Sequence, residues 1–113
     1  MIDALKMIRD NLANGVGTKE VAAALNVSRT TLDIRFLAAL GRTAATEIRR
    51  ERMDRVRQLL TTTDLPMPDV AYKTGFSSAR QLSESFRHFF YQTPTKYRKH
   101  FKSRVSHDAS RPD

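Results

Sequence analysis

Two short stretches of this chain carry side chains that can bind the edges of nucleic-acid bases. Arg80 offers a planar pair of donors suited to guanine, and a carboxylate such as Asp33 can accept a hydrogen bond from cytosine. Ile34 and Ala79 can contact the methyl group of thymine. The sequence therefore predicts two base-reading sets, which are Arg29, Thr30, Asp33 and Ile34 in one stretch and Ala79, Arg80, Ser83 and Glu84 in the other.

The two carboxylates are the most informative members of these sets. A negative charge is unfavourable beside phosphates, so its presence favours base reading over simple attraction to a polyanion. A second interpretation stays open, in which both carboxylates only make their helices soluble. Glu84 in addition follows Arg80 by four residues and precedes Arg87 by three, which are the spacings of ion pairs within a helix.

Other side chains have the chemistry to bind phosphates. The hydroxyl residues Ser28, Thr31 and Ser78 stand at the predicted beginnings of two helices, where hydroxyl and backbone N–H groups donate to phosphates. The cationic candidates, each of which could instead be a solvated surface charge, are Arg35, Arg42, Arg87, Lys96 and Arg98. Arg52 differs because it lies on the inward stripe of its predicted helix. We expect a buried or half-buried pairing there that orients the helix, and no contact with DNA.

The composition of the chain limits which partners and activities it is expected to have. The 113 residues include 20 Lys and Arg against 12 Asp and Glu, a net charge of +8 that favours nucleic acid and, less often, an anionic membrane surface. There is no cysteine, and the three histidines have no metal-site spacing. We therefore predict no metal, no cofactor and no enzymatic activity. The absence of a signal peptide and of a long apolar run predicts a cytoplasmic protein that does not bind membranes.

The elements that must position these residues are helices. Apolar side chains recur with helical spacing, and no segment has the pattern of a strand, so we predict an all-α fold of about seven helices. Thr18, Ser28 and Thr43 are expected to cap the second, third and fourth helices, and Leu32, Phe36, Ala39 and Leu40 to face inward in the third. The predicted boundaries are a first helix-turn-helix subdomain at 1–42, a linker helix at 43–63, a second helix-turn-helix subdomain at 64–101 and a disordered tail at 102–113.

The two subdomains share one pattern. A short helix, a tight turn and a longer helix occur from Val21 to Phe36 and again from Val70 to Phe86, which is the layout of a helix-turn-helix. Asn26 and Gly75 occupy the same place in the turn. Because such a turn needs a residue with positive φ, we predict that Asn26 has this conformation, as glycine does.

The signature that runs from Gly75 to Arg87 and closes in Thr93–Arg98 resembles that of the AraC/XylS family of transcription regulators, as do Ser28–Leu32 and Phe36 in the first half. The stretch from Ser28 to Phe36 is most similar to the xylose-operon regulator type. Two departures are Tyr91, where the family usually has glycine, and Asn26, which replaces a common glycine. The resemblance implies that Thr30, Asp33 and Ile34, and likewise Ala79, Arg80, Ser83 and Glu84, contact bases.

These observations predict sequence-specific binding of double-stranded DNA for transcription regulation, with two recognition helices in adjacent major grooves. The resemblance also implies RNA polymerase and an N-terminal effector or dimerisation domain as further partners. Two rival functions make different predictions for these surfaces. A helix-turn-helix used for protein contact would need an apolar patch on both long helices, and a sequence-neutral architectural protein would favour lysine and lack acidic groups on its binding face.

Overall fold

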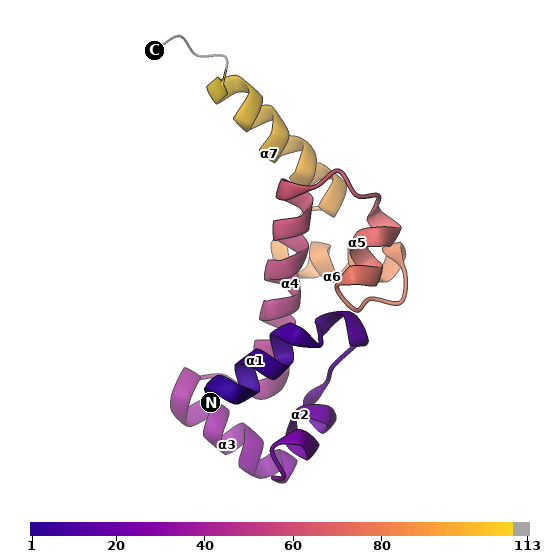
Figure 1. Cartoon of the computed structure of the whole chain (residues 1–113). Coiled ribbons are helices and arrows are strands. Elements are labelled where there is room, and N and C mark those ends of the chain that lie inside the picture. Colours follow the sequence, from indigo (N-terminus) through magenta and orange to yellow (C-terminus); the bar gives the residue numbers. More distant parts are fainter. Residues whose placement is uncertain (110–113) are drawn as a thin grey trace.

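The computed structural model describes residues 1–109, with side chains described through residue 104, and over this range it contains helices and turns but no strand. The predicted all-α fold is therefore confirmed. In Figure 1 the helix α4 runs through the middle of the molecule, with α1 to α3 gathered at one end and α5 to α7 at the other. The elements in chain order are α1 (Ile2–Asp10), a short 3-10 helix η1 (Leu12–Asn14), α2 (Thr18–Ala24), α3 (Arg29–Leu40), α4 (Ala44–Thr62), α5 (Met67–Lys73), α6 (Ala79–Phe90) and α7 (Pro94–Ala109).

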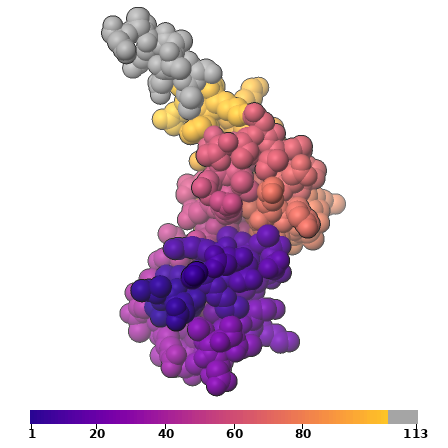
Figure 2. Space-filling model, in the orientation of Figure 1, coloured from indigo at the N-terminus to yellow at the C-terminus, as the bar shows by residue number. Residues whose placement is uncertain are grey.

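Two hydrophobic cores divide these elements into two units. The first unit consists of α1, η1, α2 and α3, and it encloses aliphatic side chains around Phe36. The second unit consists of α5, α6 and α7 and encloses Phe86, which packs against Phe90 and Tyr97. The two units abut along the molecule, as the indigo-to-purple and rose-to-orange surfaces of Figure 2 show.

The linker helix α4 belongs to both cores. Its first half contributes Ala44 and Ile48 to the first core, and its second half contributes Met53, Val56 and Leu60 to the second. All five side chains are at most 5% exposed. Burying apolar surface at both ends stabilises α4 more than its intrinsic propensity could, and it fixes the rotation of each unit about the helix.

The two helix-turn-helix turns have the same geometry. Asn26 has φ 55° and Gly75 has φ 86°, which confirms the predicted left-handed conformation of Asn26. In the first turn the N–H of Val27 donates to the carbonyl of Ala22 at 3.0 Å, and in the second the N–H of Phe76 donates to Ala71 at 2.9 Å. The repeat seen in the sequence is thus a repeat of backbone structure.

The long helix of each unit also begins and ends in the same way. Ser28 and Ser78 cap α3 and α6 through their hydroxyl oxygens, which accept from the N–H groups of Thr31 and Gln81 at 3.1 Å. At the other end Gly41 has φ 73° and Tyr91 has φ 62°. Tyrosine therefore adopts the left-handed conformation that glycine adopts in the first unit, and α6 ends where the family pattern implies.

Three sequence-based expectations need correction. The cap of α2 is Gly17 and not Thr18, because the Glu20 side chain accepts from the Gly17 N–H at 3.0 Å. Ala39 is exposed, since α3 turns this position away from the first core. The last helix does not end near Phe101 but continues to Ala109 through a polar segment that contains no glycine or proline, where the sequence predicted a disordered tail. The rest of that predicted tail, residues 110–113, lies outside the described residues.

The left-handed residues at the ends of α3 and α6 give a prediction about stability. An L-residue in this conformation loses about 1 kcal/mol or more relative to glycine. Replacing Tyr91, which is 92% exposed, with glycine should therefore raise the free energy of unfolding by about 1 kcal/mol. Gly41→Ala should lower it by about the same amount, because no described atom lies within 4 Å of the added Cβ and the cost is that of an L-residue in the left-handed conformation.

Chemical denaturation of each variant measures these changes. Tyr91→Ala is the control, since it removes the side chain but keeps the strained backbone, and its stability should match that of the parent. A Tyr91→Gly variant that is no more stable than Tyr91→Ala would contradict the argument.

Candidate nucleic-acid interface

The predicted base-reading residues of α3 lie on the side opposite to its buried residues Leu32 and Phe36. Arg29 and Thr30 are exposed in the first turn, and Ile34, one turn further on, is 61% exposed. A solvent-exposed isoleucine lacks the stabilisation that burial of its side chain would give. Its exposure therefore favours a surface that another molecule covers.

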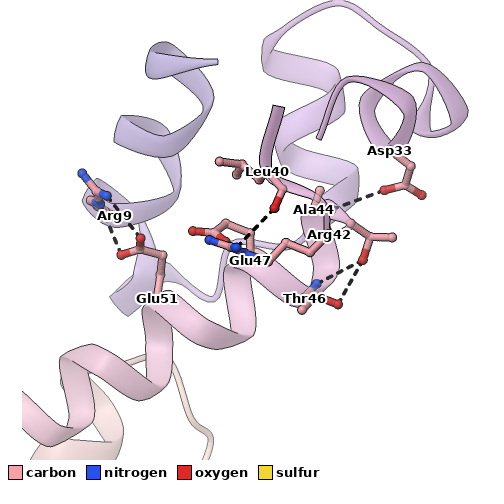
Figure 3. A network of polar contacts seen from close by, with 9 residues as sticks. Arg9, Asp33, Leu40, Arg42, Ala44, Thr46, Glu47 and Glu51 are labelled. Carbon is pink, nitrogen blue, oxygen red and sulfur yellow. Dashed lines mark hydrogen bonds and ion pairs between the residues drawn. The ribbon is translucent and has the colours of Figure 1, made fainter. Parts of the chain in front are cut away.

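Asp33 has a structural partner that the sequence did not indicate. Its side chain is half-buried, and Oδ1 accepts a hydrogen bond from the N–H of Ala44 at 3.4 Å (Figure 3). Ala44 is the first residue of α4, so a carboxylate of α3 caps the linker helix where its N-terminal dipole favours a negative charge. Asp33 can therefore read a base only if it uses its other carboxylate oxygen or gives up the hydrogen bond to Ala44.

In α6 the reading set contains an ion pair. Arg80 Nε donates to Glu84 Oε1 at 3.1 Å, which is the intrahelical pairing that the sequence left open for Glu84. Both side chains are largely exposed, at 88% and 67%, so the pair contributes little to stability and can open at small cost. Ala79 and Ser83 are half-buried beside them. The structure thus brings the four predicted residues onto one accessible side of α6.

The residues predicted to bind phosphates fall into two groups. Arg35, Arg87 and Lys96 are exposed, and within residues 1–104 no hydrogen-bond partner is found for their side-chain cations, although the backbone N–H of Lys96 donates to Thr93 Oγ1 at 3.2 Å. The hydroxyls of Ser28 and Ser78 are occupied as helix caps, and Thr31 Oγ1 accepts from Ser28 Oγ at 3.0 Å.

Arg42 and Arg98 have protein partners. Arg42 binds the buried carboxylate of Glu47 and the carbonyl of Leu40 (Figure 3), and the hydrogen bond to Glu47 raises the pKa of the guanidinium above its usual value. Arg98 Nε donates to the carbonyl of Leu60 at 3.2 Å and Nη1 to that of Leu65 at 2.7 Å, which fastens α7 to the end of α4. Either side chain would have to give up these contacts in order to bind a phosphate. The carbonyl partners could not be found from the sequence, because every residue has a backbone carbonyl group.

Arg52 joins the two units. Its Nε donates to the carbonyl of Thr74 in the second unit at 2.9 Å, and its Nη2 donates to the carbonyl of Val16 in the first at 3.2 Å. The guanidinium also lies 5.9 Å from the ring centre of Phe76, and burial lowers the pKa of Arg52 below its usual value. The predicted half-buried pairing of Arg52 on the inward side of the linker helix is confirmed.

A close backbone approach lies beside this arginine. A Cβ added to Gly75 would lie 2.1 Å from the carbonyl oxygen of Leu12, which is in the first unit. Only glycine fits this position, so Gly75 is required twice, for its positive φ and for this contact. The ion pair between Arg9 of α1 and Glu51 of α4, with Nε and Oε2 3.2 Å apart, in addition holds the first unit to the linker helix.

Known proteins have similar sequences and the same arrangement of helices. Residues 21–100 match the model of a family described as a helix-turn-helix domain. The xylose operon regulatory protein of Escherichia coli K12 is 29% identical over 98 residues, which are 87% of this chain but 25% of that protein. The chain therefore spans about a quarter of the length of this curated relative.

Two solved structures are similar over most of their lengths. The DNA-binding domain of AdpA in complex with a target DNA has 26% identity and a TM-score of 0.84, covering 91% of this chain and 93% of that one. A transcriptional regulator of Chromobacterium violaceum, described as containing an AraC-type DNA-binding domain, has 29% identity and a TM-score of 0.75, with 85% and 86% covered.

The contacts of Arg52 predict a large loss of stability when they are removed. Arg52→Ala should lower the free energy of unfolding by about 2 kcal/mol, because it deletes two charge-assisted hydrogen bonds and leaves two carbonyls without these partners. Arg55→Ala is the matched control on the same helix, since Arg55 is exposed and its only side-chain bond among the described residues is to Gln58 of α4, at 2.6 Å. We expect a change below about 0.5 kcal/mol for this control. Equal losses in the two variants, measured by chemical denaturation, would show that Arg52 does not join the units.

Proposed function

This chain belongs to the helix-turn-helix family of AraC-type DNA-binding domains, and on that basis we propose that it regulates transcription by binding a specific DNA sequence, with α3 and α6 in successive major grooves. The observation that carries the proposal is the pairing of two exposed helices on a shared, doubly buried linker. The DNA complex of AdpA, whose DNA-binding domain has the same fold, supports it.

The dimensions of the linker fit this mode of binding. The 19 residues of α4 span about 28 Å, which is close to the distance of about 34 Å between equivalent major-groove positions one turn apart. Because Arg52 and Gly75 hold the two units together, the protein cannot extend freely to make up the difference. The duplex would bend instead, and sequences that bend easily would be favoured.

The two reading surfaces differ in chemistry, which predicts an asymmetric site. The surface of α3 presents the hydroxyl of Thr30 and the apolar side chain of Ile34, suited to thymine-containing steps. The surface of α6 presents Arg80 and Glu84, which are suited to guanine and cytosine. One copy of the chain could thus read two different half-sites in a fixed order.

A helix-turn-helix used for protein contact is the rival function, and it has one supporting observation. Ile34 and Leu37 are both exposed on α3, at 61% and 50%. No large apolar side chain of α6, all of whose residues are described, is exposed to a similar degree, so the two long helices do not form a common apolar surface. Thymine methyl groups provide an apolar partner for Ile34 within the DNA-binding function.

The wider setting of the chain is part of the proposal. An effector-binding or dimerisation domain is a proposed partner, supported by the greater length of the xylose operon regulatory protein. RNA polymerase is proposed as a second partner, and the cytoplasm as the location. Within residues 1–109, no helix is both long and apolar enough to cross a membrane.

The decisive experiment is selection of bound duplexes from a random pool, followed by binding measurements with variants. Arg80→Ala should leave the fold intact, because Arg80 is exposed and pairs only with Glu84 among the described residues. If Arg80 reads a guanine, the loss of binding should be about 1–3 kcal/mol on the selected site and should vanish on a site that lacks that base. A loss of the same size on every sequence would exclude base reading by Arg80.

Lys96 should behave as a phosphate contact. Affinity for any duplex should fall steeply with salt because binding releases counterions from the phosphates. Lys96→Ala should weaken binding to all sequences by a similar factor and reduce the slope of log K against log salt by about 1. An unchanged slope would mean that Lys96 is only a solvated charge.

A further inference from the structure

A groove of about 660 Å³ separates the two units beside α6. Its walls come from both units and from the linker helix, and its polar lining includes Thr18, Arg49, Arg52, Glu84, Ser85 and His88. We propose that this groove receives the sugar-phosphate backbone of the bound duplex between its two reading sites, and that Arg49 binds a phosphate there. The inference rests on the proposed function.

The groove adjoins the predicted reading surface of α6. Glu84 belongs to both, since it lines the groove and pairs with Arg80 of the reading set. Ser85 and His88, which follow at the next positions of the same side of the helix, continue the wall away from the reading surface. A duplex seated on α6 and extending toward the first unit must therefore pass over this groove.

Arg49 is the cation that the structure leaves available in the groove. On α4 it stands two residues after Glu47 and two before Glu51, and two positions correspond to 200° around a helix. Both carboxylates consequently lie on the opposite side of α4, where they bind Arg42 and Arg9. Arg49 is exposed, and within the described residues no acidic partner is found for it.

The remaining charges of the groove also favour an anion. Arg52 lines it, while the carboxylate of Glu84 is offset by Arg80. On one face of a duplex, two successive major grooves are separated by a minor groove that is bordered by two sugar-phosphate strands. When α3 and α6 occupy the major grooves, these strands are the part of the DNA that faces the space between the units. The positive charge of the groove and its position between the two units therefore match these two sugar-phosphate strands.

The test compares Arg49→Ala with Arg50→Ala on a duplex selected from a random pool. Arg50 is the matched control, because it carries the same charge on the same helix, is also exposed and does not line the groove. Arg49→Ala should weaken binding about tenfold and lower the salt slope by about 1, as loss of one phosphate contact predicts. Arg50→Ala should change the affinity less than about twofold, and thermal melts should show both variants folded.

A duplex with neutral methylphosphonates midway between the two half-sites locates the contact. The parent protein should bind it about tenfold more weakly than the unmodified duplex, whereas Arg49→Ala should bind the two duplexes equally. Equal losses in the two arginine variants, or an Arg49→Ala variant that still distinguishes the duplexes, would overturn the proposal while leaving DNA binding intact. If the parent protein selects no duplex at all, the proposed function fails and the groove contact fails with it.

Discussion

The way in which the two units of this molecule meet depends on the placement of one guanidinium group, that of Arg52. Arg52 donates to a carbonyl of each unit, Val16 in the first and Thr74 in the second, from a position near the middle of the helix that connects them. Arginine suits this task because its planar group has several donors at fixed angles and remains charged even when burial disfavours the charge. This bridge adds to the shared burial of α4 and to the close approach of Gly75 to Leu12, and together these contacts hold the two units, and with them α3 and α6, at a defined orientation.

Arginine side chains also hold the two ends of the linker helix. Arg98 binds the carbonyls of Leu60 and Leu65, and Arg42 binds the buried carboxylate of Glu47 near the beginning of α4. Part of the net charge of +8 is therefore structural, because several cations are held by backbone carbonyls or by acids of the linker. The charge available to a polyanion is that of the exposed residues, such as Lys96 and Arg49. The net charge counted from the sequence is thus an upper limit on the positive charge that the surface can offer to a polyanion.

The two units show how one backbone pattern can carry different surfaces. Serine caps, matching turn hydrogen bonds and buried Phe36 and Phe86 occur at equivalent places in both. These features fix the long helix of each unit and leave its outer side chains unconstrained by packing. The outer face of α3 can consequently carry the apolar Ile34 and Leu37 and that of α6 the Arg80–Glu84 ion pair without any change in fold. The left-handed Tyr91 shows that even the glycine expected at a helix end can be replaced when the surrounding structure holds the backbone.

The sequence by itself determined the helices, the serine cap of α3, the repeated turn with Asn26 at positive φ, and the inward position of Arg52, because helical periodicity and turn chemistry act over a few neighbouring residues. Its wrong predictions are also local, as at the cap of α2, where Glu20 selects Gly17, and beyond Phe101, where a polar composition predicts disorder but the helix continues to Ala109. Only the tertiary structure decided which charged residues are occupied. The hydrogen bond of Asp33 to Ala44, the carbonyl partners of Arg98, the contact of Gly75 with Leu12 and the groove beside Arg49 all join residues that are distant along the chain, or involve backbone atoms that every residue has. Such contacts depend on how the two units meet, and no local pattern of residue types records that geometry.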